Sequence, residues 1–112
     1  LVSTIGDYAA VGSYVPKGAG LSTAAYADMT KPWAPFDGKP NEAMGLGWEI
    51  MDGPPDDPTI LMHTGSENGI KTMIILLPAS QRGLVIFTNG ERGMDVIVPI
   101  LRSALHLKEL GP

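Results

Sequence analysis

The chain has no cysteine, and this absence excludes a disulfide framework and a thiolate metal site, while leaving the redox compartment undetermined. Basic residues are also scarce: eight Lys and Arg stand against twelve Asp and Glu, for a net charge of −4, and they form no cluster. Nucleic acid and anionic membrane are therefore not expected partners. No apolar run approaches the roughly 20 residues that cross a bilayer. The N-terminus does not show the residue order of an export signal.

What remains is the composition of a globular protein. Hydrophobic residues make up 44% of the 112 and charged residues only 18%, which argues against disorder. A chain of this length can bury one core without metal or disulfide. We therefore expect a single domain over residues 1–112. Because residue 1 is a leucine and not a methionine, we expect the chain to begin inside a longer or processed polypeptide.

Two short helices are predicted near the N-terminus. Ser3 or Thr4 can cap the first, which Pro16 ends. Ser22 can cap the second, over residues 23–29. Residues 32–45 contain three prolines and two glycines, and we expect irregular surface chain there.

The second half of the chain reads as strands followed by a helix. Apolar and alternating runs predict strands over residues 46–51, 59–63, 71–77 and 84–88. The turns between them fall at 52–58, 65–69 and 78–83. Asp52, Asp56 and Asp57 superficially suggest a calcium loop, but the prolines among them favour a solvated turn.

The last predicted element is an amphipathic helix over about residues 94–110. Its apolar stripe consists of Ile97, Ile100, Leu101, Ala104 and Leu105, with Arg102, Lys108 and Glu109 off the stripe. Pro99 leaves two alternatives: the helix begins near Val98, or it is kinked at the proline. The predicted fold class is α+β, an antiparallel sheet of three to four strands with the C-terminal helix packed on one face and short N-terminal helices.

One stretch has the composition of a site. His63 ends a short apolar run and is followed by Thr64, Gly65 and Ser66. A glycine there lets a ligand approach the backbone, and the next N–H is free to donate. Taken alone, the tripeptide is weak evidence, because a histidine at a strand end is more commonly solvated than catalytic. His63 and His106 share no spacing with acidic residues that indicates a metal site.

The surrounding sequence strengthens this interpretation. The H-T-G-S-x-x-G motif at His63, the two following strands, the T-N-G end of the second and the last helix together resemble the serine β-lactamase and penicillin-binding protein superfamily. The nearest branch is the class C β-lactamases with their esterase and D-aminopeptidase relatives. Residues 1–8 are similar to the L-x-S-T-x-x-D-Y helix start of that family, and Leu46-Gly47-Trp48 resembles its G-L-G-W strand.

The resemblance implies a partial β-lactamase-like fold and assigns roles to the motif. His63, Thr64 and Gly65 would bind substrate, and the backbone N–H of Ser66 would be one oxyanion donor in catalysis. The family acylates a serine in S-x-x-K, helped by a tyrosine in Y-x-N. None of the six serines here has a lysine three residues on, and none of the three tyrosines has an asparagine two residues on.

Two functions from different classes remain open. In the first, the chain is the C-terminal portion of a serine hydrolase that cleaves an ester, amide or β-lactam without a cofactor, and it is inactive alone. In the second, it is a binding or assembly module that pairs through an exposed strand edge at residues 84–88, either as a homodimer or with the missing N-terminal segment. A proteolytic remnant without a function of its own is a third alternative.

Overall fold

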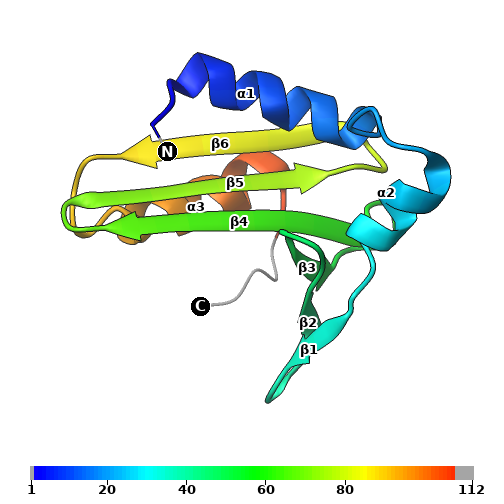
Figure 1. Cartoon of the computed structure of the whole chain (residues 1–112). Coiled ribbons are helices and arrows are strands. Elements are labelled where there is room, and N and C mark those ends of the chain that lie inside the picture. The colour runs from blue at the N-terminus through cyan, green and yellow to red at the C-terminus, as the bar shows by residue number, and fades with distance from the viewer. Residues whose placement is uncertain (1, 108–112) are drawn as a thin grey trace.

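The computed structural model describes residues 2–107 and contains one antiparallel sheet of six strands in the order β1-β2-β3-β4-β5-β6. Every strand pairs with its neighbours along the chain, so the sheet is a simple meander (Figure 1). The strands are β1 Ala34–Phe36, β2 Lys39–Met44, β3 Glu49–Asp52, β4 Thr59–Glu67, β5 Ile70–Leu77 and β6 Arg82–Thr88. The helices are α1 Ile5–Tyr14, the 3-10 turn η1 Val15–Lys17, α2 Thr23–Met29 and α3 Met94–Leu105.

The α+β class is confirmed, but the prediction of three to four strands is wrong. The two additional strands, β1 and β2, lie in the segment expected to be irregular. They form a hairpin around Asp37-Gly38, where Gly38 has a φ of 72° that suits glycine. Pro35 lies on β1, the edge of the sheet, where a missing N–H costs no ladder hydrogen bond.

Helices cover both faces of the sheet, and β5 is its most buried strand. Met73, Ile75 and Leu77 point to the face that α3 covers, where they pack in one cluster with Ile97 and Leu101. The intervening residues of β5 point the other way, into a cluster near α1 and α2. Five consecutive side chains of β5 are thus buried, as predicted for a strand covered on both faces. Each contributes about 1.5–3 kcal/mol by burial.

The helix starts largely follow the predictions. Thr4 and Ser22 accept hydrogen bonds from the N–H groups of Asp7 and Ala25, each at 3.1 Å, and so cap α1 and α2. The alternative that places the start of the last helix near Val98 is wrong, because α3 starts at Met94 and Pro99 lies inside it. The predicted continuation of the helix beyond Leu105 is wrong for residues 106–107, because α3 ends at Leu105 and His106 has a left-handed φ of 56°. The predicted positions of Lys108 and Glu109 lie outside the described residues.

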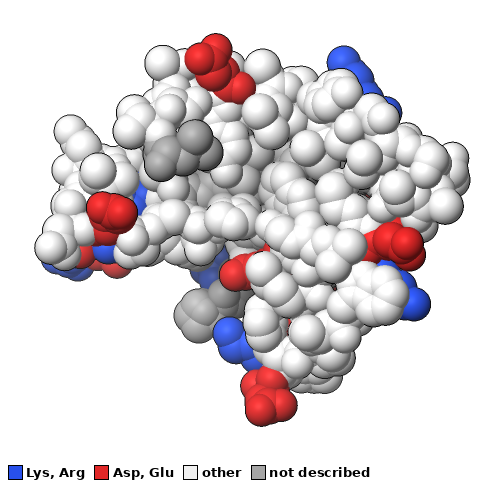
Figure 2. All heavy atoms as spheres, in the orientation of Figure 1, with Lys and Arg blue, Asp and Glu red and all other residues white. Residues whose placement is uncertain are grey.

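Charge is not concentrated on the face of the molecule seen in Figure 2. Lys and Arg, and Asp and Glu, form small separate groups there on a mostly uncharged surface. Within residues 2–107, no helix has both the length and the apolar character needed to span a membrane.

Candidate functional site

The predicted motif lies on β4, where that strand extends past its neighbour β3. Pairing with β3 ends at Glu49 opposite Met62, whereas pairing with β5 continues to Glu67 opposite Ile70. Residues 63–67 therefore have a strand on one side only. The predicted strand end at residue 63 and turn at 65–69 are wrong: β4 continues to Glu67, and the turn is Asn68-Gly69 alone, with a φ of 75° at the glycine.

The direction of the backbone N–H groups follows from the ladder. In an antiparallel sheet, successive residues turn their N–H and C=O toward opposite neighbours. At the start of β4 the carbonyl of Pro58 accepts from the Gly53 N–H on the β3 side, at 3.1 Å. Thr64 and Ser66 are an even number of residues further on, so their N–H groups point to the same side, beyond the end of β3. Within residues 2–107 neither N–H has a hydrogen-bond partner.

The side chains of the motif do not converge on one face. Leu61 packs in the cluster near α1, so His63 and Gly65 share that face. The His63 ring lies edge-on to Trp48, with ring centroids 6.4 Å apart. Thr64 and Ser66 point to the opposite face. The four predicted residues are exposed, and what they share is the open edge of the strand.

A lysine that the sequence analysis missed contacts the motif. Lys71 faces Ser66 across the hairpin, and its Nζ donates to Ser66 Oγ at 2.8 Å, to the Glu67 carbonyl at 3.2 Å and to Glu91 Oε1 at 2.9 Å. Three acceptors match the three N–H donors of an ammonium group. Lys71 Nζ is therefore a hydrogen-bond donor to Ser66 Oγ. The signal available in the sequence was Asn68-Gly69, because a two-residue turn there places residues 66 and 71 opposite one another.

Glu91 joins this group from the connection between β6 and α3. Its Oε2 accepts from the Gly69 N–H at 2.6 Å, while its Oε1 accepts from Lys71. The hydrogen bond from Lys71, followed by that from Gly69, holds the pKa of the Glu91 carboxyl below its usual value. The carboxylate thus links the turn of the hairpin to the segment that leads into α3.

A second charged cluster lies at the other end of β4. Asp57 is only 2% exposed, so the prediction of a solvated turn is wrong for this residue. It accepts from the Ser80 N–H at 3.0 Å and from Arg82 at 3.1 Å. Burial opposes ionisation of Asp57, but the hydrogen bonds from Ser80 and Arg82 outweigh it and lower its pKa. In residues 2–107, no three His, Asp or Glu side chains are grouped to hold a metal ion.

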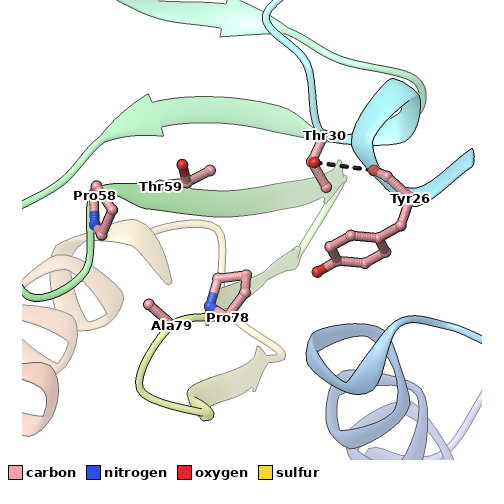
Figure 3. A pocket seen from close by; sticks show the side chains of 6 residues that line it. All are labelled: Tyr26, Thr30, Pro58, Thr59, Pro78 and Ala79. Carbon is pink, nitrogen blue, oxygen red and sulfur yellow. Dashed lines mark hydrogen bonds between the residues drawn. The ribbon is translucent and has the colours of Figure 1, made fainter. Parts of the chain in front are cut away.

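A cavity of about 220 Å³ lies beside α2, also away from the motif. Figure 3 shows its walls: Tyr26, Thr30, Pro58, Thr59, Pro78 and Ala79. The hydroxyl of Tyr26 is buried and has no hydrogen-bond partner within residues 2–107. None of the residues that line the cavity belongs to the predicted motif. The open edge of β4, which carries the motif, is the better candidate site.

Comparison with known proteins bears on this candidate. A family model described as Beta-lactamase matches residues 1–107. A search of curated proteins found no match. The matched stretch includes the open edge of β4, its neighbours β5 and β6, and all three helices. The chain belongs to the beta-lactamase family.

Proposed function

We propose that this chain is the C-terminal portion of a serine β-lactamase-like hydrolase and contributes the H-T-G strand and half of the oxyanion hole. The observation that carries this proposal is the unpartnered, outward N–H of Ser66 on the open edge of β4. Membership of the beta-lactamase family supports a hydrolase in general terms. The roles of the individual residues are our inference.

The chemistry requires such a donor. When a serine hydroxyl attacks the carbonyl carbon of an ester, amide or β-lactam, the carbonyl oxygen becomes an oxyanion. Two N–H groups aimed at that oxygen stabilise it. Ser66 supplies one N–H, and the second comes from the nucleophile itself, which lies outside this chain. His63 and Thr64 flank the edge and bind polar groups of the substrate, and Gly65 lets the substrate approach the strand.

Without a nucleophile and its lysine, the 112-residue chain is inactive alone. We expect it to hydrolyse neither a chromogenic cephalosporin nor a p-nitrophenyl ester faster than buffer does. Turnover clearly above the buffer rate would refute this expectation. The sequence encoded upstream provides the second check, because an S-x-x-K and a Y-x-N there are required by the proposal.

A matched pair of variants tests the role of the Ser66 N–H in the polypeptide that carries the serine nucleophile. Ser66→Pro removes an N–H that the sheet does not use, so the strand can tolerate it. Loss of one oxyanion donor lowers kcat about 100-fold or more. Ser66→Ala retains the N–H and should lose only several-fold. Equal activity in the two variants would exclude the oxyanion role.

A second candidate function is that of a binding or assembly module. β6 is the last strand of the sheet, and no strand within residues 2–107 pairs with its outer edge. Its residues Leu84, Val85, Ile86 and Phe87 are apolar, and an open apolar edge favours pairing. We expect a homodimer, or association with a chain that bears S-x-x-K. Light scattering that shows a monomer at high concentration, with no such partner bound, would contradict it.

A further inference from the structure

We propose that Lys71 and Glu91 are positioning residues that hold the tip of the β4–β5 hairpin, and with it the outward N–H of Ser66. This inference rests on the function proposed for Ser66. It adds two residues for which neither the family motif nor the sequence spacing provides a role.

The tip of the hairpin needs support. Residues 63–67 of β4 have β5 on one side, and within residues 2–107 no strand lies on the other. A strand held by one neighbour is free to twist away from the plane of the sheet. The direction of the N–H groups of Thr64 and Ser66 would change with that twist. An oxyanion donor must lie about 2.7–3.1 Å from the oxygen it stabilises, and this narrow range requires a fixed strand.

The hydrogen bonds of Lys71 and Glu91 provide that support from a third element. Lys71 holds the Ser66 side chain and the Glu67 carbonyl, and Glu91 holds both Lys71 and the Gly69 N–H. These contacts span the last residues of β4, the turn and the first residues of β5. The Lys71 side chain is only 16% exposed although it lies near the tip.

The segment that carries Glu91 is itself fixed to the core. Gly93 is buried two residues further on, and a side chain there would lie 2.9 Å from Lys71 Cβ. α3 then begins at Met94, and Ile97 in its first turn is fully buried in one cluster with Met73 of β5. Glu91 therefore holds the tip of the hairpin from a position that the core defines.

Amide NMR on the 112-residue chain tests the inference without any substrate. In Lys71→Met and in Glu91→Gln, the resonances of Ser66 and Gly69 should move. Hydrogen exchange of the Glu67 and Ile70 amides, which face each other at the turn, should accelerate about threefold or more because charge-assisted bonds are lost. The urea midpoint should change little. In Lys71→Arg, which keeps a charged donor, the Ser66 resonance should stay close to its position in the original chain.

Arg92→Met is the matched control. Arg92 follows Glu91 directly but pairs with Asp95, at 2.7 Å, and contacts no hairpin residue among its described partners. Unchanged Ser66 and Gly69 resonances in Lys71→Met and Glu91→Gln would overturn the inference, as would equal changes in Arg92→Met. The turnover assays test the proposed hydrolase function separately, so failure of one proposal is distinguishable from failure of the other.

Discussion

Replacing Asp57 by asparagine is expected to lower the free energy of unfolding by about 2 kcal/mol at neutral pH. Asp57 is 2% exposed, and its two oxygens accept from the Ser80 N–H and from Arg82. Arg82 also donates to the Leu105 carbonyl at 3.4 Å. One carboxylate thus connects the loop before β4, the turn before β6 and the end of α3.

The magnitude follows from what asparagine cannot do. Its amide NH₂ must face either the Ser80 N–H or the Arg82 guanidinium, and both are donors. A hydrogen bond to a charged group contributes about 1.5–3 kcal/mol. Breaking a fully buried ion pair costs about 3–5 kcal/mol, but the Arg82 side chain is 40% exposed and solvent screens the pair. The expected loss is therefore about 2 kcal/mol, which is less than for a fully buried pair and within the range for a hydrogen bond to a charged group.

The pH dependence has a definite sign. The pKa of an aspartate is ordinarily about 4, and in the folded state the pKa of Asp57 lies below that value. The charged form therefore stabilises the fold above that ordinary value, and the stabilisation is lost as the pH falls through the lowered pKa. The difference between the original chain and Asp57→Asn should be full at pH 7 and shrink below about pH 4.

Urea unfolding at pH 7 and pH 3, followed by fluorescence of Trp33 and Trp48, measures both quantities. Arg82→Met combined with Asp57→Asn completes a double-mutant cycle that isolates the pair from the Ser80 bond. Equal stability of Asp57→Asn and the original chain at pH 7, within a few tenths of a kcal/mol, would refute the reasoning. If the difference in free energy of unfolding between the original chain and Asp57→Asn stays constant from pH 7 to pH 3, the predicted pH dependence is refuted, but the predicted loss at pH 7 is not.

Four glycine substitutions, one of them a control, give further predictions, each read by urea unfolding. Gly93→Ala should lose about 2 kcal/mol because its Cβ would collide with Thr88 Oγ1 and Lys71 Cβ, whereas Gly90→Ala, with open space around it, should lose little. Gly65→Ala should lose about 1 kcal/mol through a Cβ placed 2.5 Å from Thr72 Oγ1, and Thr72→Ala in the same chain should recover most of it. Gly6→Ala, on an exposed turn of α1, should gain about 0.5 kcal/mol from helix propensity.

The sequence predicted best the elements whose residue pattern is required by burial or by helix capping. β5 has five consecutive apolar residues, and a strand covered on both faces requires them. The caps of α1 and α2 were predictable because a hydroxyl preceding an apolar-periodic segment has few other roles. Local chemistry and burial agree at these positions.

The β1–β2 hairpin was missed because three prolines dominate its segment. Proline excludes a residue from a ladder only where its N–H would be used, and Pro35 lies on the edge strand. Pro40 on β2 precedes the residues that pair with β3, which begin at Glu42. The Asp37-Gly38 pair was the signal for a hairpin.

The site was only partly predictable. The motif could be located by its residue types. Lys71 contacts it because the β4–β5 register places Lys71 opposite Ser66, and Glu91 reaches Lys71 from the connection between β6 and α3. These two partners lie 20 positions apart in the chain, and no pattern in the intervening residues relates them. Burial of Asp57 likewise depends on the turn before β6 and on the end of α3, which residues 52–58 do not reveal.

Two of the stretches that resemble family motifs, Leu46-Gly47-Trp48 and His63-Thr64-Gly65, lie beside each other at the open edge of β4. Residues 46–48 were predicted as the start of a strand but lie in a turn: the Gly45 N–H donates to the Trp48 carbonyl at 2.7 Å, and Gly47 has a φ of 86°. The Leu46 N–H ties this turn to the end of α2 through the Met29 carbonyl. β3 consequently starts only at Glu49, opposite Met62.

Had β3 begun at the turn residues, its ladder would have covered Thr64 and Ser66, and their N–H groups would be used within the sheet. The glycines of this turn therefore leave the H-T-G edge open. The same turn brings Trp48 against His63. A β-branched residue at position 47 favours a strand, but it does not tolerate the φ of 86° that Gly47 adopts. This substitution should therefore destabilise the fold and should not extend β3 over the open edge.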